Sequence, residues 1–330
     1  MASVAASGFV KWLSSTRVFL ARSRCGKVGV AAGSGILALA IGLLAARHFA
    51  ETAWPLSRGN PGLLVAVGFL FLFAYALKAF GWRRLFAVGE RPQTIALAAA
   101  NGGASVGGMA LPGRFDDAIR VAIVRRYPGC PVGVPALCLS LVMLGLIDSA
   151  ALAPLAGAAA GSIGGVTGVR AGLAVVTAAG IAAAALVLAM PRLAASRRLL
   201  RFRLGRWLSP RTTSLRGAVE AWALVSACWL VRALAFFLLL GGLGVGFSFP
   251  LALLFLCAGA AAAALPIGPA GAATQMGAGG AALIASGIGA SQALAAAVSV
   301  GAIGVLAGGA VLLAAVVWRT SLALVPARAT

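Results

Sequence analysis

The sequence predicts an all-α integral membrane protein with about six full spans and two re-entrant helical hairpins, arranged as an inverted repeat. Composition is the first reason for this fold class. Hydrophobic residues make up 62% of the 330-residue chain and charged residues only 10%, which is too few charges to solvate the surface of a soluble domain of this length. The stretch 233–318 contains no acidic, basic or histidine residue. We therefore expect one membrane domain and no separate soluble catalytic domain.

The second reason is a pair of matching breaks in the apolar sequence. One reads ALPGRFDDAIR (110–120) and the other reads ALPIGPAGAATQ (264–275). Helices that are broken at corresponding places in two halves of a chain indicate a binding site at the interface between repeats, as in transporters. The residues expected to break these helices are Pro112, Gly113, Pro266, Pro269 and Gly271.

The third reason is the distribution of positive charge. The net charge is +21, and the cationic residues gather beside apolar segments, where Lys and Arg mark the cytoplasmic side of a membrane protein. We therefore interpret these clusters as a topology signal that also attracts anionic lipid headgroups. Their place beside apolar segments argues against nucleic acid as a partner. The densest group consists of Arg192, Arg197, Arg198, Arg201, Arg203, Arg206, Arg211 and Arg216.

These charges give each apolar segment a direction across the membrane. A basic segment, 1–27, is expected in the cytoplasm, and the membrane domain is expected to cover 28–318. This domain divides into a first half at 61–155, a linker span at 166–190, a basic loop at 191–216 and a second half at 217–318. The membrane segments in order are spans at 28–46 and 61–80, a hairpin at 94–127, spans at 135–155, 166–190 and 218–244, a hairpin at 250–288, and a span at 292–318 before a cytoplasmic tail at 319–330.

The two hairpins then enter the membrane from opposite faces, 94–127 from the inside and 250–288 from the outside. This makes the two halves inverted relative to each other and places both chain ends in the cytoplasm. Irregular backbone at membrane depth is tolerated only where protein or water surrounds it, so we expect both breaks to meet inside the bundle. The alternative is that each hairpin forms two full spans, for which 250–265 and 270–288 are marginal or short.

Several short motifs resemble one known family. The segment PGRFDDAIR (112–120) is similar to the Pro-Gly-Arg-x-Gly-Glu-x-x-Arg signature of the lysylphosphatidylglycerol synthase transmembrane region, also called the flippase-like domain family. Asp116 and Asp117 stand where that signature has Gly and Glu, and the Glu-Arg pair that usually precedes Asp148 is replaced by Leu144 and Gly145. The positions that match family motifs are Pro112, Gly113, Arg114, Arg120, Asp148, Pro269 and Gly271.

The resemblance implies a lipid-translocating or lipid-handling domain of the bacterial cytoplasmic (inner) membrane. In bifunctional family members such a domain precedes an aminoacyl-transferase, and we expect neither that activity nor any other enzymatic activity from this chain. Two function classes remain open. One is a flippase-like transporter that moves an anionic phospholipid or a polyprenyl-linked lipid between leaflets. The other is a non-transporting scaffold or partner of an envelope-lipid or glycosyl-transfer enzyme.

The first break carries the predicted headgroup site. A helix that starts after this break would point its free N–H groups at an anion, and Arg114 adds a planar fork suited to phosphate. The carboxylates also suit a helix start as caps, so a capped helix with surface ion pairs is the alternative. The residues predicted to bind the anionic headgroup are Arg114, Asp117 and Arg120, together with Arg83 and Arg84 from the family-like segment KAFGWRRLF (78–86).

Two ionisable residues lie well inside predicted spans, where such groups are functional candidates by default. They are Asp148 and Arg232, which we expect to form an intramembrane charge pair, either as a structural link or as a pair with which a lipid phosphate or a proton competes. Lys78 is expected to reach the interface with its amine. With one histidine and no CxxC spacing in the chain, we expect no metal, no cofactor and no catalytic residue.

Overall fold

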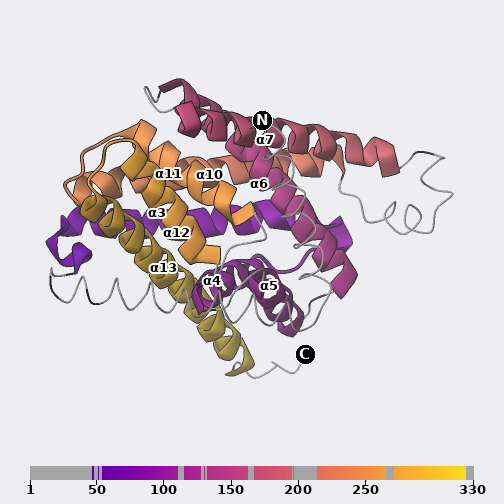
Figure 1. Ribbon diagram of the computed structural model, residues 1–330. Helices are drawn as coiled ribbons and strands as arrows, with labels where there is room; N and C mark the ends of the chain where they lie inside the picture. The colour runs from indigo at the N-terminus through magenta and orange to yellow at the C-terminus, as the bar shows by residue number, and fades with distance from the viewer. Residues whose placement is uncertain are drawn as a thin grey trace, which may run out of the picture.

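The described part of the protein is helical throughout, as seen in a computed structural model (Figure 1). The structure describes residues 47, 51, 54–110, 115–127, 130, 132–162, 167–194, 196, 214–264 and 271–324. Two short 3-10 helices, η1 (Pro55–Arg58) and η2 (Val88–Glu90), flank the first long helix. The α-helices are α3 (Pro61–Arg83), α4 (Thr94–Ala110), α5 (Phe115–Arg126), α6 (Val134–Ser162), α7 (Thr167–Ala194), α10 (Leu215–Gly242), α11 (Phe249–Ala264), α12 (Gly271–Ala285) and α13 (Ala290–Leu324).

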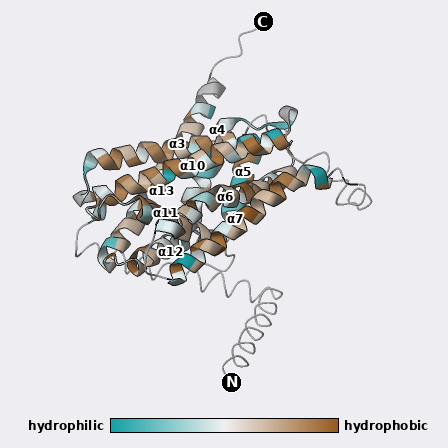
Figure 2. Cartoon of the chain, turned by 90° about the horizontal axis from the view of Figure 1, so that it is seen from above, coloured by the Kyte–Doolittle hydropathy of each residue, from teal (hydrophilic) through white to brown (hydrophobic). Residues whose placement is uncertain are grey.

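Five of these helices are long and apolar enough to cross a membrane: α3, α6, α7, α10 and α13. They agree with five of the six predicted full spans, while the predicted first span, 28–46, lies outside the described residues. Most residues of these helices are hydrophobic (Figure 2). The prediction of an all-α, multi-pass membrane protein is therefore confirmed in this coarse form.

The centre of the bundle is an antiparallel pair formed by α3 and α10. At one end, the backbone N–H of Asn60 donates to the carbonyl of Gly242 at 3.1 Å, and the Asn60 side chain caps α3. At the other end, Arg84 forms an ion pair with Glu220 at 3.1 Å. Gly81 lets the two helices approach closely, because a Cβ there would lie 3.0 Å from the side chain of Val225. These contacts fix the register of the central pair.

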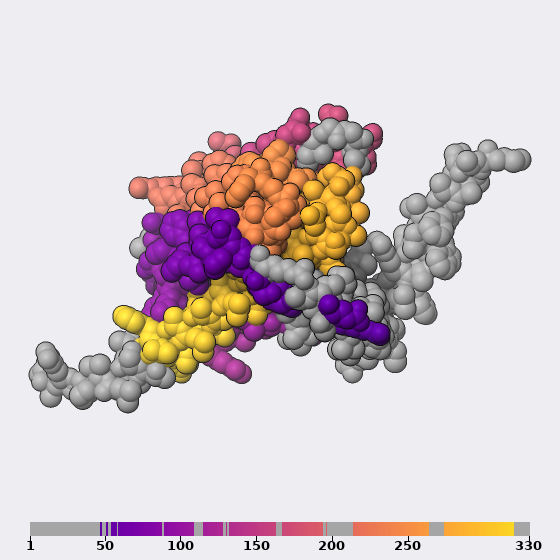
Figure 3. Space-filling view, turned by 90° about the vertical axis from the view of Figure 1, so that its left-hand side faces the viewer, coloured from indigo at the N-terminus to yellow at the C-terminus, as the bar shows by residue number. Residues whose placement is uncertain are grey.

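Each half of the chain places a pair of shorter helices beside its long ones. The pair α4–α5 lies on either side of the first predicted break, and the pair α11–α12 lies on either side of the second; both breaks, 111–114 and 265–270, fall outside the described residues. Across the two halves, α4 packs against α13, and α11 packs against α6. In the space-filling view the indigo surface of α3 lies beside the orange and yellow surfaces of the second half (Figure 3).

Small residues set the closest helix crossings. At the α4–α13 crossing, a Cβ at Gly308 would lie 2.9 Å from the carbonyl oxygen of Gly102 and 3.1 Å from the Ser105 Cβ. The α6–α7 crossing depends on Gly180 in the same way, because a Cβ there would meet Ala153. Close approach through small residues is the usual packing mode of helices in lipid, and here it brings polar groups of different helices within reach of one another.

Candidate functional site

A charged cluster lies inside the bundle where α3, α6 and α10 meet. The Lys78 amine on α3 forms an ion pair with Asp148 on α6, with Nζ and Oδ2 2.8 Å apart. The other carboxylate oxygen of Asp148 accepts a hydrogen bond from the indole N–H of Trp229 on α10 at 3.0 Å. The two charged side chains are only 11% and 20% exposed. Both oxygens of this intramembrane carboxylate therefore have a donor from another helix.

Arg232 lies one helical turn beyond Trp229 on α10 and is the second cation of the cluster. Its guanidinium carbon lies 5.3 Å from the centre of the Trp229 ring and 5.8 Å from that of Tyr75, distances at which a cation is attracted to an aromatic face. Among the residues that the structure describes, no carboxylate forms an ion pair with Arg232, and its Nε–H is buried without a hydrogen-bond partner. The cluster thus contains two cations for one carboxylate.

The pairing differs from the predicted one. The structure pairs Asp148 with Lys78 instead of with Arg232, and Lys78 points between helices instead of reaching the interface. The reason is the direction of one face of α3: Trp82, one turn from Lys78, donates to Ser140 at 2.9 Å on the same helix that carries Asp148. The four-residue spacing of Lys78 and Trp82 is the sequence signal that could have indicated this face.

Tyr75 connects the cluster to the second half of the chain. Its hydroxyl donates to the carbonyl of Gly304 on α13 at 3.2 Å, and the Ser105 hydroxyl on α4 donates to the same carbonyl at 3.3 Å. Because the Tyr75 ring also faces Arg232, one side chain contacts both the unpaired cation and the α4–α13 crossing. A movement of α4 or α13 would therefore reach the charged cluster directly.

The residues predicted to bind a headgroup on α5 form a separate group. Arg120 contacts Asp117 at 2.6 Å and Asp116 at 3.2 Å, both in the first turn of its own helix. Ile119 and Ile123 of the same helix pack over Gly107 and Gly103 of α4, which holds α5 against the bundle. Arg120 is thus already neutralised by two carboxylates. Arg114, the centre of the predicted site, lies outside the described residues, as do Pro112, Gly113, Pro266 and Pro269, whereas Gly271 begins α12.

The other two predicted headgroup residues lie at the end of α3. Arg84 shares Glu220 with Arg216, whose Nε lies 3.0 Å from the carboxylate. Among the described residues, the buried Nε–H of Arg83 has no hydrogen-bond partner. Between described residues, no ion pair joins this group to the α5 group or to the Lys78–Asp148 pair. The structure therefore separates the predicted site residues into three groups and adds Lys78, Tyr75 and Trp229, which no sequence motif indicated as site residues.

Within the described ranges, no set of three His, Cys, Asp or Glu side chains is grouped so that it could hold a metal ion. In the described cluster, two cationic side chains and two aromatic rings gather around a single carboxylate. An excess of positive charge of this kind attracts an anion.

Comparison with known proteins identifies the family. No curated protein and no solved structure matches this chain. The sequence profile described as "Lysylphosphatidylglycerol synthase TM region" matches residues 28–311, which is most of the chain and includes the charged cluster. The protein therefore belongs to the lysylphosphatidylglycerol synthase transmembrane-region family.

Proposed function

We propose that this protein moves an anionic lipid, a phospholipid or a polyprenyl-linked lipid, between the two leaflets of the bacterial inner membrane. The observation that carries the proposal is Arg232, a half-buried arginine whose Nε–H is buried without a hydrogen-bond partner and which forms no ion pair with a carboxylate among the described residues. An ionisable group at this depth is costly unless it is paired or hydrated. A lipid phosphate would supply the missing negative charge and fits the planar fork of an arginine.

The depth of Arg232 supports transport over binding at the surface. Arg232 is about 15 Å of helix rise from Gly242, where α10 ends, and about 18 Å from Glu220 near its start. The hydrocarbon core of a bilayer is about 30 Å thick, so this cation is near its middle. A phosphate that crosses the membrane meets its highest electrostatic barrier there, and a fixed cation lowers that barrier.

We also propose that the two halves of the chain form an inverted repeat, each with one re-entrant hairpin. The helices of the two short pairs contain 17, 12, 16 and 15 residues, fewer than the roughly 20 that a full span requires, which supports two re-entrant hairpins. The exchanged packing of α4 on α13 and of α11 on α6 is what a pseudo-two-fold axis in the membrane plane would produce. With basic ends on the cytoplasmic side, both chain ends are cytoplasmic.

The test is lipid transfer in liposomes with fluorescently labelled phosphatidylglycerol or phosphatidylcholine. We compare wild type with Arg232→Gln and, as a matched control, with Arg170→Gln, which removes an exposed cation at the start of α7. Hydrogen bonds to charged groups contribute roughly 1.5–3 kcal/mol, so Arg232→Gln should slow transfer of the anionic lipid about tenfold or more. Arg170→Gln should change it by less than about twofold, because a solvated charge contributes little.

Folding of each variant is checked by size-exclusion chromatography before transfer is measured. Arg114→Ala, examined in the same assay, tests the inner-leaflet binding site predicted at the first break. If wild type transfers no anionic lipid at all, the transport proposal fails, and the scaffold for an envelope-lipid enzyme becomes the better account. Equal loss in Arg232→Gln and Arg170→Gln would show that Arg232 acts only as a general positive charge.

A further inference from the structure

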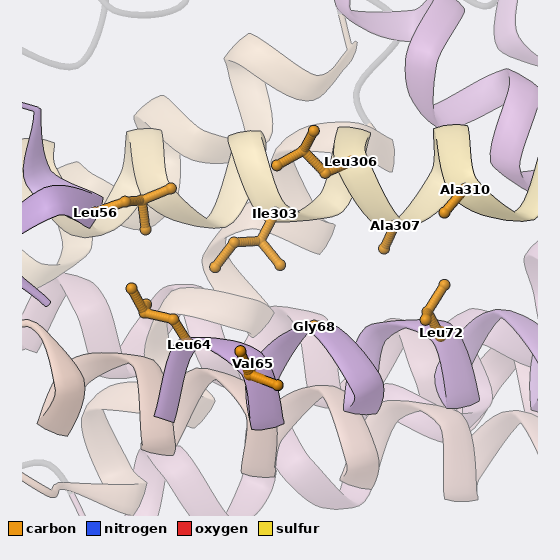
Figure 4. A pocket seen from close by; sticks show the side chains of 9 residues that line it. All are labelled: Leu56, Leu64, Val65, Gly68, Leu72, Ile303, Leu306, Ala307 and Ala310. Atoms are coloured by element: carbon orange, nitrogen blue, oxygen red, sulfur yellow. The ribbon is translucent and has the colours of Figure 1, made fainter. Parts of the chain in front are cut away.

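An apolar groove lies between α3 and α13 on the outer surface of the bundle. Its volume is about 370 Å³, and its lining consists of Leu56, Leu64, Val65, Gly68, Leu72, Ile303, Leu306, Ala307 and Ala310. Ile303, Ala307 and Ala310 of α13 point toward Leu64 and Leu72 of α3 across the space between the two helices (Figure 4). The groove is open to its surroundings, because Val65 is 59% exposed and Leu306 is 68% exposed.

The inner end of the groove adjoins the charged cluster. On α3, Tyr75 follows Leu72 by three residues, which places both on one face of the helix. The Tyr75 hydroxyl donates to Gly304, the residue next to Ile303 of the lining. Its ring is 5.8 Å from the Arg232 guanidinium. One aromatic side chain therefore stands between the apolar groove and the unpaired cation.

Resting on the transport function proposed above, we propose that this groove binds one acyl chain of the lipid whose phosphate is held by Arg232. The lipid then enters sideways between α3 and α13, with its chain pointing toward the Leu56 end and its phosphate passing Tyr75. An amphiphile is the ligand class that fits both parts, since the groove offers apolar side chains alone and the cluster offers an excess of positive charge.

The shape of the lining fits an extended hydrocarbon chain. Gly68, Ala307 and Ala310 provide the room, because none of them carries a side chain beyond Cβ. The lining follows both helices, from 64 to 72 on α3 and from 303 to 310 on α13, so the space is elongated as an extended acyl chain is (Figure 4). The groove opens on the lipid-facing surface, where it is surrounded by the acyl chains of membrane lipids. An acyl chain can therefore enter the groove without passing through water.

Tyr75 has a specific role in this arrangement. Its hydroxyl interacts with α13 and its ring with Arg232. Tyr75 therefore lies between the proposed site of the acyl chain and that of the headgroup and contacts both. Tyr75→Phe keeps the ring and removes the hydroxyl, and the affinity for the acyl chain should then change little. Tyr75→Ala removes the ring that lies between the two sites, and the affinity for both the acyl chain and the headgroup should fall.

The test uses phosphatidylglycerol with a photoactivatable diazirine at the end of one acyl chain, in vesicles of phosphatidylcholine that contain the wild-type chain. Mass spectrometry of the labelled peptides should find adducts in α3 and α13 in excess over those in α7. Ala310→Trp fills the inner end of the groove at an exposed position, and it should reduce this labelling about fivefold or more, an effect expected from steric exclusion of the chain. Ala178→Trp, an exposed control on α7, should leave it unchanged.

The outcomes separate this inference from the transport function. Equal labelling of α3, α13 and α7, or labelling that Ala310→Trp does not reduce, overturns the groove as a chain site even when lipid transfer is normal. Labelling of the groove in a protein that transfers no lipid supports the chain site and overturns the transport function. Crosslinks that join 28–46 to the groove in place of lipid adducts would show that a segment of the chain itself occupies it, and would overturn the inference.

Discussion

Two charged groups of this protein contain the same kinds of side chain but balance their charges differently. On α5, one guanidinium, that of Arg120, contacts two carboxylates of its own helix, and the three side chains are 21–41% exposed. Among α3, α6 and α10, one carboxylate, that of Asp148, lies between two cations, and its pair with Lys78 is 11–20% exposed. Both arginines have a buried Nε–H without a hydrogen-bond partner. The difference is that carboxylates outnumber the cation in the α5 group, whereas Arg232 forms no ion pair with a carboxylate among the described residues.

The difference teaches that density of charged residues in a sequence is a poor guide to an anion site. What matters is which cation is left without a carboxylate after folding and how dry its surroundings are. A buried charge without a partner is far more expensive than a solvated one, so an unpaired buried cation is the stronger indication of a ligand. Variants in the two groups should therefore differ in how much stability they lose.

Asp148→Ala should have the largest effect. It leaves two cations in the membrane interior without a carboxylate, and breaking a buried pair from one side costs about 3–5 kcal/mol. The readout is the thermal unfolding midpoint in detergent micelles, with Asp117→Ala as the control from the α5 group. Lys78→Met combined with Asp148→Leu removes both charges of the pair and should recover much of the loss. A double variant no more stable than Asp148→Ala would contradict a direct interaction between Lys78 and Asp148.

Trp229→Phe should have an intermediate effect. The change keeps a ring next to Arg232 but removes the N–H that donates to Asp148 at 3.0 Å, and hydrogen bonds to charged groups contribute roughly 1.5–3 kcal/mol. The expected decrease in the thermal unfolding midpoint should disappear in a protein that already carries Asp148→Leu, because the hydrogen-bond acceptor is then absent. A full loss in that background would mean that Trp229 acts only through packing.

Asp117→Ala on α5 should have the smallest effect. Its contact with Arg120 is local and partly solvated, and exposed ion pairs of this kind contribute about 0.2–1 kcal/mol. The small loss should shrink further when salt is raised, because exposed charges are screened. A loss as large as that of Asp148→Ala would show that the α5 group is buried in the membrane protein, and the comparison between the two groups would fail.

Apolar length predicted the helices well, because a bilayer imposes a minimum span. The predicted span 61–80 corresponds to α3 (Pro61–Arg83), and 292–318 corresponds to α13 (Ala290–Leu324). Helix ends differ where a helix continues beyond the apolar stretch, as α13 does past Trp318, since hydropathy marks the membrane and not the hydrogen bonding of the backbone.

The partner of Asp148 could not be predicted in the same way. Which of several cations reaches a carboxylate depends on how α3 and α6 each pack against α10. That packing depends on small residues such as Gly81, where a Cβ would meet Val225 of α10. A lysine on a lipid-facing surface extends its amine to the membrane interface, and this was expected of Lys78. Lys78 instead points toward Asp148 on α6. Two of the predicted features, the helix breaks and Arg114, lie outside the described residues and stay predictions.

Binding of a short-chain anionic lipid at Arg232 can be measured directly. Purified wild type, Arg232→Gln and Arg120→Gln are titrated with short-chain phosphatidylglycerol, and with phosphatidylcholine of equal chain length, while the thermal unfolding midpoint is followed. A ligand that binds only the folded state raises this midpoint. The account predicts that phosphatidylglycerol stabilises wild type and Arg120→Gln similarly, more than phosphatidylcholine does, and that Arg232→Gln loses this preference. Retention of the full preference in Arg232→Gln, or its loss in Arg120→Gln, would contradict the claim that the unpaired intramembrane arginine holds the lipid headgroup.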